Sequence, residues 1–165
     1  MLTADDLTGL YPALVTPFDG DDALDTAGLS RLVERMFDGG ARGIVPLGGT
    51  AEYTAMSPAE RRAAVECAVE AARARGPVVA GVLSPGYAEA KAAGLDFRAA
   101  GADAIMLLTP FYAIGDQPGL AAYIRRFREA VDLPLVLYEI PARTNVSLAP
   151  ETIAALAEDG TAIGI

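Results

Sequence analysis

Polar and aromatic residues follow four of the apolar segments of this chain. They are Thr16-Pro17, Gly48-Gly49-Thr50-Ala51-Glu52, Thr109-Pro110-Phe111-Tyr112, and Tyr138 with Pro141-Ala142-Arg143-Thr144. The N–H groups of a glycine turn and a threonine hydroxyl suit a carboxylate or a developing oxyanion. An arginine binds a second carboxylate through two parallel hydrogen bonds, and a tyrosine transfers a proton once its pKa is lowered. Together these residue types suit the binding of a small keto acid.

Each of these residues also has a purely structural interpretation. Gly48-Gly49 can serve turn geometry alone, and Tyr138 can belong to the core with its hydroxyl hydrogen-bonded. Arg143 can be a solvated loop side chain, and Glu52 can simply end a helix. Cys67 stands among alanines and indicates a small hydrophobic residue. Because polar residues recur at several segment ends in a row, the functional interpretation is favoured.

Six short apolar segments alternate with longer amphipathic ones. Each is about as long as a strand, and most are flanked by glycine or proline. Continuous hydrophobicity is typical of parallel strands that are buried on both faces. The predicted strands cover residues 11–15, 43–47, 78–83, 104–108, 135–138 and 162–165.

Five amphipathic segments between these strands predict helices. Ser57-Pro58-Ala59-Glu60 has the order of a capping box with proline at the first helical position. Gly40 and Gly101 open two similar segments at the passage from helix to strand, where glycine is typical of a helix C-cap. The predicted helices cover residues 25–37, 58–75, 87–100, 120–131 and 150–157.

Strict alternation of strands and helices predicts an α/β fold with a parallel sheet, either doubly wound or closed as an eight-stranded barrel. A doubly wound fold calls for a glycine-rich phosphate turn after the first strand, where Thr16-Pro17-Phe18-Asp19 stands instead. The pattern therefore favours the (β/α)8 TIM barrel. A complete barrel takes roughly 200–250 residues or more. We therefore expect residues 1–165 to form the N-terminal two-thirds of a single barrel domain, with six strands and five helices.

Composition and charge exclude several classes of protein. Thirteen Lys and Arg against 22 Asp and Glu give a net charge of −9, which opposes nucleic-acid binding. Without histidine there is no imidazole base, and the single Cys67 has no partner for a disulfide or a zinc site. Residues 1–7 do not resemble a signal peptide, and no apolar segment is long enough to span a bilayer. We expect a cytoplasmic protein without a metal site that binds neither nucleic acid nor membranes.

Three motifs resemble those of one family. Val15-Thr16-Pro17-Phe18 is similar to its opening strand, and Gly48-Gly49-Thr50-Ala51-Glu52 to its Gly-Thr-Thr-Gly-Glu or Gly-Ser-Thr-Gly-Glu loop. Tyr138-Glu139-Ile140-Pro141-Ala142-Arg143-Thr144 is similar to its Tyr-Asn-(Ile/Val)-Pro-x-Arg-Thr motif. The chain thus resembles the dihydrodipicolinate synthase / N-acetylneuraminate lyase family over its whole length.

The resemblance implies a class I pyruvate-dependent aldolase that needs no cofactor. In this family a lysine forms an imine with the ketone of pyruvate, and the derived enamine attacks an aldehyde. Tyr138 would be the proton shuttle. Tyr112 would be the proton-relay tyrosine that one subunit contributes to the active site of its partner across a dimer interface. Thr50 and the amides around Gly49 would hold the pyruvate carboxylate, and Arg143 would bind the carboxylate of the second substrate. The implied assembly is a homodimer or homotetramer.

Several positions depart from the family pattern. Gly49 stands where synthases carry the threonine or serine that links the two tyrosines. A glycine at this position is more like the sugar-acid dehydratases of the family, whereas Arg143 is more like the synthases. Asn145 replaces a usual glycine, and asparagine tolerates left-handed backbone. The family's lysine follows directly after Gly-Ile, which is here Gly164-Ile165 at the chain end. The only lysine, Lys91, lies among alanines in a predicted helix, and we expect it to face solvent.

For the full-length parent these observations predict a lyase of the 4-hydroxy-tetrahydrodipicolinate synthase type, which condenses pyruvate with an aldehyde. One alternative is a 2-keto-3-deoxy sugar-acid dehydratase or aldolase of the same family. The other is a non-catalytic fragment or pyruvate-binding protein, because the chain as given lacks the nucleophilic lysine and is expected to be inactive.

Overall fold

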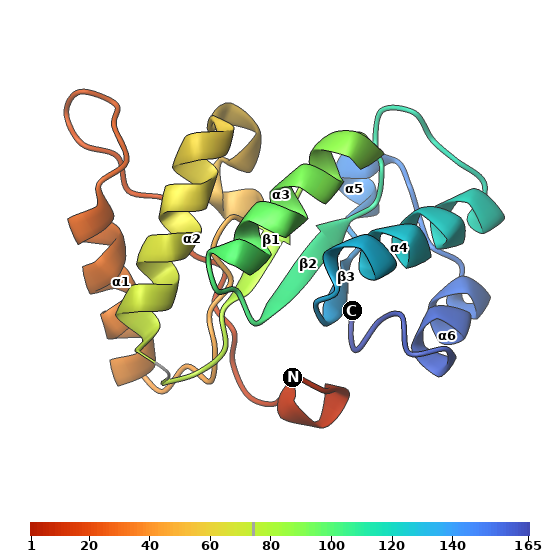
Figure 1. Cartoon of the computed structure of the whole chain (residues 1–165), viewed down its shortest axis with the longest axis horizontal. Coiled ribbons are helices and arrows are strands. Elements are labelled where there is room, and N and C mark those ends of the chain that lie inside the picture. The colour runs from red at the N-terminus through yellow and green to blue at the C-terminus, as the bar shows by residue number, and fades with distance from the viewer. Residues whose placement is uncertain (74) are drawn as a thin grey trace.

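A parallel sheet forms the centre of the fold and consists of β1 (Val79–Val82), β2 (Ala104–Leu108) and β3 (Leu135–Tyr138). The computed structural model describes residues 1–73 and 75–165. The strands lie in the order β1-β2-β3, and every pair is parallel. Their carboxyl ends therefore meet at one edge of the sheet, at the top of Figure 1.

Isolated parallel bridges extend this sheet on both sides. Ala13 pairs with Val45, Ile44 with Val78, and Val136 with Gly164. All six predicted segments therefore lie side by side in chain order, but the prediction of six regular strands needs correction. Pro12 and Pro46 interrupt the first two segments, and proline has no N–H group to donate to a ladder. Among the described residues, the last segment, 162–165, pairs with β3 through a single bridge.

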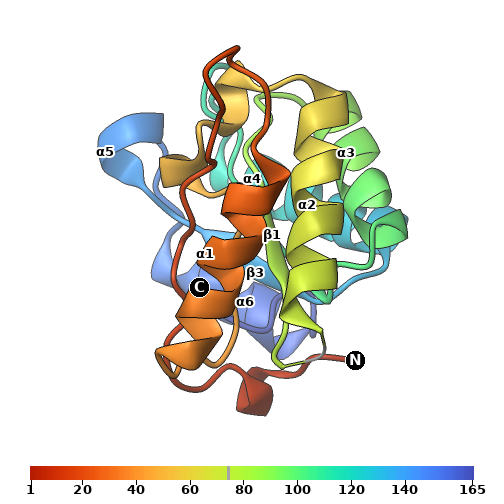
Figure 2. The ribbon, with the colours of Figure 1, turned by 90° about the vertical axis from the view of Figure 1, so that its left-hand side faces the viewer.

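The five predicted helices are confirmed, and they pack against one another in chain order along one face of the sheet (Figure 1). Figure 2 shows the first two of them side by side. One short helix follows β3 and was not predicted. The helices are α1 (Thr26–Asp38), α2 (Pro58–Ala72), α3 (Tyr87–Ala99), α4 (Gln117–Val131), α5 (Pro141–Thr144) and α6 (Pro150–Glu158), and 3-10 turns lie at Ala4–Asp6, Gly49–Ala51 and Tyr53–Ala55.

Side-chain caps set where the longer helices begin. The capping box of α2 is confirmed: Glu60 N–H donates to Ser57 Oγ at 3.3 Å, and Ser57 N–H donates to Glu60 Oε2 at 2.7 Å. Asp116 Oδ1 accepts from Gly119 N–H at 2.9 Å, so α4 begins three residues before its predicted start at position 120. The predicted end of α2 at position 75 was too late, because Arg73 already adopts a left-handed conformation; Ala74 lies outside the described residues.

The two faces of the sheet are buried to different extents: the β2 and β3 residues that face the helices are buried, whereas Met106 and Val136 on the other face are only partly buried. The main core lies between sheet and helices, where Val33, Ile105 and Phe127 are fully buried. On the other face Val79 and Ala104 belong to a smaller buried cluster. Gly40 and Gly101 have φ values of +91° and +93°, which confirms their predicted roles after α1 and α3. No helix of the part that the structure describes is long and apolar enough to cross a membrane.

Candidate active site

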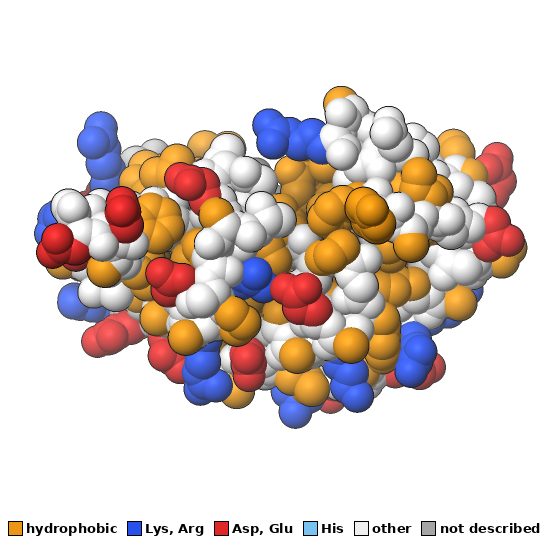
Figure 3. Space-filling view, turned by 90° about the horizontal axis from the view of Figure 1, so that it is seen from above, with side chains coloured by type: hydrophobic (Ala, Val, Ile, Leu, Met, Phe, Trp, Pro, Cys, Tyr) orange, Lys and Arg blue, Asp and Glu red, His pale blue; other side chains and the backbone are white. Residues whose placement is uncertain are grey.

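A cavity of about 160 Å³ opens at the carboxyl ends of the strands. Its walls come from the segment after residue 48, from the ends of β1 and β2, and from β3 and α5. The lining includes Gly49, Tyr53, Phe111, Tyr138 and Arg143. Seen from above, hydrophobic side chains spread over much of this face, and most charged side chains lie toward its margins (Figure 3).

A larger hollow of about 460 Å³ lies at the opposite ends of the strands. Arg42, Pro77 and Asp103 line it; Pro77 lies two residues before β1, and Asp103 immediately precedes β2. In parallel βα folds the chemistry gathers at the carboxyl ends of the strands, and the opposite face serves stability. The smaller cavity is therefore the better candidate for an active site.

Tyr138 and Gly49 approach each other closely at this cavity. Tyr138 is the last residue of β3, and Gly49 opens the 3-10 turn Gly49–Ala51. A Cβ atom built on Gly49 would lie 2.9 Å from the Tyr138 hydroxyl oxygen. The absence of a side chain at position 49 therefore leaves room for the phenol above the turn.

Backbone geometry and two threonines hold the turn in place. Leu47 and Glu52, which flank it, both have left-handed backbone with φ of 61° and 59°. Thr16 donates its hydroxyl proton to the carbonyl of Ala51 at 2.8 Å, and Thr50 donates to the carbonyl of Leu14 at 3.2 Å. The predicted role of Thr50 as a donor to a substrate carboxylate therefore needs a different hydroxyl orientation, because a threonine has a single hydroxyl proton.

Two backbone amides of the turn remain available. Across the residues that the structure covers, the N–H groups of Gly49 and Thr50 donate to no protein acceptor, as expected for the first donors of a helical turn. Thr50 itself is exposed. The amides, rather than the threonine hydroxyl, are thus the free donors of this segment.

Arg143 reaches the same cavity from α5 and is exposed. Within the described ranges it has no carboxylate at ion-pairing distance. Its loop is fixed by the Thr144 hydroxyl, which lies 3.1 Å from the Ile140 carbonyl, and by Glu139, whose carboxylate accepts from Leu148 N–H at 2.8 Å. The left-handed backbone predicted for Asn145 is present, with φ of 53°.

The structure brings together three of the five predicted site residues, Gly49, Tyr138 and Arg143. Tyr112 does not line the cavity: it lies in the loop between β2 and α4 with its side chain 91% exposed. Lys91 is exposed on α3, as expected, and lies outside the cavity lining.

Sequence reasoning missed Tyr53, which lines the cavity with a side chain only 2% exposed. Its hydroxyl lies 2.9 Å from Ser84 Oγ, which follows β1. The available signal was an aromatic residue directly after the glycine turn. Phe111 was noted only as part of its segment, yet it contributes to the cavity whereas the neighbouring Tyr112 does not.

Comparison with known proteins agrees with this geometry. The sequence pattern of the dihydrodipicolinate synthetase family matches residues 6–165. The chain belongs to this family. It is 43% identical over 157 residues to the 4-hydroxy-tetrahydrodipicolinate synthase of Hyphomonas neptunium, covering 95% of this chain and 53% of that protein. The corresponding enzyme of Salinibacter ruber is 38% identical over 151 residues, with 92% of this chain and 50% of that protein covered.

A solved family structure resembles the fold closely. The dihydrodipicolinate synthase of Acinetobacter baumannii, complexed with pyruvate, superposes with a TM-score of 0.89 at 36% identity, over 93% of this chain and 53% of that one. The chain therefore spans about half the length of the family members that it matches.

Proposed function

We propose that this chain provides the substrate-binding part of a pyruvate-dependent carbon–carbon lyase of the 4-hydroxy-tetrahydrodipicolinate synthase type. The observation that carries the proposal is the convergence of Gly49, Tyr138 and Arg143 on one cavity at the carboxyl ends of the strands. Glycine-turn amides, a phenol and an unpaired guanidinium are the groups that a small keto acid and a second carboxylate require.

Each group has a definite task in this chemistry. The amides of Gly49 and Thr50 bind the carboxylate of pyruvate, and the Tyr138 hydroxyl moves a proton beside the ketone carbon. A lysine amine attacks that carbon and water leaves, which gives an imine; loss of a methyl proton then gives an enamine that attacks the aldehyde. The family resemblance places that lysine directly after Ile165. Arg143 binds the carboxylate of the aldehyde substrate.

The architecture that suits this function is a (β/α)8 barrel to which residues 1–165 contribute six parallel segments. The bridges at Ala13–Val45 and Val136–Gly164 support this proposal, because they extend the three-stranded parallel sheet by further parallel segments on both sides. A homodimer or homotetramer would give the exposed Tyr112 a partner's site to enter. These assemblies and a cytoplasmic location stay predictions.

Borohydride trapping tests the proposed function. The complete gene product is incubated with pyruvate, reduced with borohydride and digested, and the peptide masses are measured by mass spectrometry. We expect the mass increase of one reduced pyruvate on a lysine directly after Ile165, and none on Lys91. A complete protein without any such adduct is not a Schiff-base enzyme, and the pyruvate-binding alternative then takes its place.

A 2-keto-3-deoxy sugar-acid dehydratase or aldolase is the second candidate. Gly49 favours it, because the resemblance gives a Gly-Gly-Thr loop to the sugar-acid dehydratases, whereas the synthases carry a threonine or serine at this position. Arg143 at the cavity favours the synthase. Turnover measured with a panel of carboxylated aldehydes and sugar acids separates the two.

A further inference from the structure

Arg61 is a buried arginine behind the cavity wall, and the chemistry proposed above does not use it. It lies on α2 and is 8% exposed. Its guanidinium carbon lies 4.1 Å from the centre of the Tyr53 ring, and its Nε–H lies 3.0 Å from the carbonyl oxygens of both Tyr53 and Met56. One side chain thus holds the beginning and the end of the 3-10 turn Tyr53–Ala55.

The same arginine and tyrosine reach two further elements. Arg61 pairs with Glu89 of α3 at 2.9 Å, and the Tyr53 hydroxyl lies 2.9 Å from Ser84 Oγ after β1. Burial raises the pKa of Tyr53, which keeps its hydroxyl neutral and able to share a hydrogen bond with Ser84. The turn is therefore tied to α2, to α3 and to the end of β1.

This network lies next to the proposed carboxylate site in the chain. Glu52, with its left-handed backbone, is the single residue between the Gly49–Ala51 turn and the Tyr53–Ala55 turn. The Thr16 and Thr50 hydroxyls hold the Gly49–Ala51 turn, and the buried Tyr53, whose ring forms part of the cavity wall, fixes the chain directly after it. A displacement of Tyr53 would act on the turn through Glu52 and shift the amides of Gly49 and Thr50.

We propose that Arg61 and Tyr53 are positioning residues that hold the Gly49–Thr50 amides in the geometry that binds a carboxylate. The proposal rests on the proposed function only for the identity of the ligand. Arg61→Met would leave the carbonyl oxygens of the buried residues Tyr53 and Met56 without this partner, which is costly, whereas the exposed Glu89 carboxylate would be solvated.

Hydrogen exchange of the 165-residue chain tests the positioning directly. Arg62→Met is the matched control, since Arg62 is the next residue on α2 and its side chain is exposed. In Arg61→Met we expect the segment 48–56 to exchange at least about tenfold faster than in the control, with β2 and β3 unchanged. Arg61→Lys should be intermediate, because it retains the charge opposite Glu89 but loses the guanidinium Nε donor to the two carbonyls.

Kinetics of the complete gene product supply the second measurement. We expect the KM for pyruvate to rise at least about tenfold in Arg61→Met and kcat to change less, because the amides bind the ground-state carboxylate. If Arg61→Met does not fold, Tyr53→Phe provides the same comparison with Tyr87→Phe as control. Tyr53→Phe removes only the bond to Ser84, and should speed exchange of segment 48–56 by a smaller factor.

Two outcomes would overturn the inference. Exchange of segment 48–56 that is equal in the Arg61 or Tyr53 variants and in their controls would show that these residues do not hold the turn. A KM for pyruvate that stays at the wild-type value in a folded Arg61→Met protein would show that they do not position the amides. A wild-type protein that forms no imine would refute the proposed function but not this inference. Hydrogen exchange would still show whether Arg61 and Tyr53 hold the turn.

Discussion

The Tyr138 hydroxyl oxygen lies only 2.9 Å from the point that a Cβ atom on Gly49 would occupy. Two residues separated by more than half of the chain therefore lie side by side in the cavity lining. The phenol can lie above the glycine turn only while position 49 carries no side chain.

Gly49→Ala should displace the Tyr138 phenol and lower kcat of the complete gene product by about 10–100-fold, since small misplacements of a catalytic group are costly. Gly48→Ala is the control, because a Cβ there would lie 3.7 Å from Ala13 Cβ and Met106 Cε, at ordinary contact distance. The melting temperatures of Gly48→Ala and Gly49→Ala should match, so that a difference in kcat between them does not reflect unfolding. Equal turnover in wild type and Gly49→Ala would mean that the phenol is not confined by the turn.

Tyr138→Phe should lower turnover by about 100-fold or more, the loss expected for a general acid–base group. The free energy of unfolding should hardly change, because Tyr138 is only partly buried and the substitution removes the hydroxyl group alone. Steady-state kinetics and urea unfolding measure the two effects separately. Unchanged turnover would remove Tyr138 from the mechanism.

Arg143→Ala should raise the KM for the carboxylated aldehyde by about 10–100-fold, which corresponds to the loss of a hydrogen-bonded charge pair. The KM for pyruvate should change little, since the glycine-turn amides bind that carboxylate. Arg143→Lys retains the charge but lacks the two parallel donors of a guanidinium. Its KM for the aldehyde should therefore lie between the values of wild type and Arg143→Ala. Equal effects on both substrates would assign Arg143 a structural role.

Gly81→Ala should destabilise the fold by about 1–3 kcal/mol through overpacking. A Cβ on this β1 residue would overlap the carbonyl oxygen of Leu47 and lie 2.7 Å from its carbonyl carbon. Gly20→Ala is the control, because a Cβ there meets no atom within 4 Å. The free energy of unfolding in urea gives both values, and a wild-type value for Gly81→Ala would contradict the close contact.

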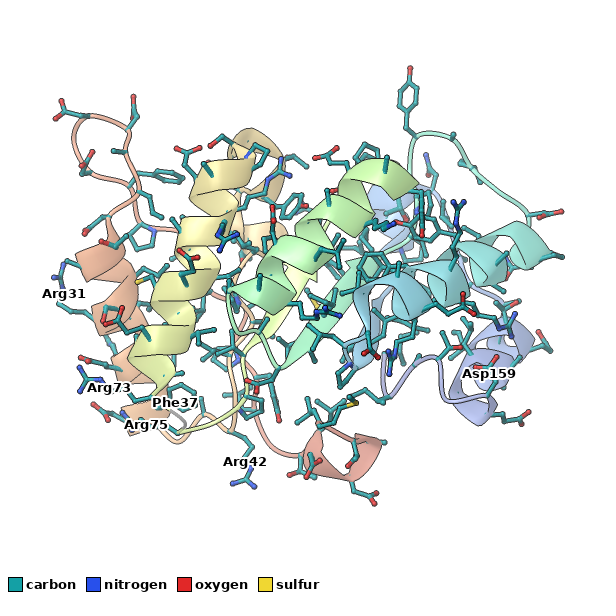
Figure 4. All side chains as sticks on the ribbon, viewed as in Figure 1. Arg31, Phe37, Arg42, Arg73, Arg75 and Asp159 are labelled. Atoms are coloured by element: carbon teal, nitrogen blue, oxygen red, sulfur yellow. The ribbon has the colours of Figure 1, made fainter. Side chains whose placement is uncertain are left out.

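Asp159→Asn should reduce the pH dependence of stability in acid. Hydrogen bonding by Thr161, followed by that of Arg125 from α4, lowers the pKa of Asp159 below its ordinary value of 3.8. A group whose folded pKa is lowered stabilises the fold above its ordinary pKa, and this contribution is lost as pH falls through the lowered value. Asp159 lies at the end of α6 (Figure 4).

Urea unfolding above and below pH 3.8 checks this prediction. The wild-type and Asp159→Asn curves should differ most above that pH and converge as the pH falls from it through the lowered pKa of the folded state. Arg125→Met should remove a smaller part of the same pH dependence, because Thr161 makes the larger contribution. Parallel curves at every pH would show that Asp159 does not contribute in this way.

The capping box at Ser57, the five longer helices and the parallel order of the segments were predictable because each depends on neighbours in the chain. Ser57 and Glu60 find each other across one helical turn, and Gly40 and Gly101 are needed wherever a helix turns back into a strand. The extent of pairing was less predictable. Segments 11–15 and 43–47 make isolated bridges in place of regular ladders, because Pro12 and Pro46 have no N–H group to donate.

The sequence by itself determined the βα alternation, the family and the candidate residues Gly49, Tyr138 and Arg143, since motif spacing and hydrophobic periodicity are written along the chain. Only the tertiary structure decided that Tyr53 lines the cavity, that Tyr112 points away from it in the single chain, and that the Thr50 hydroxyl donates to Leu14. Side-chain direction and hydrogen-bond partners depend on groups that are distant in sequence, and folding alone brings these groups together.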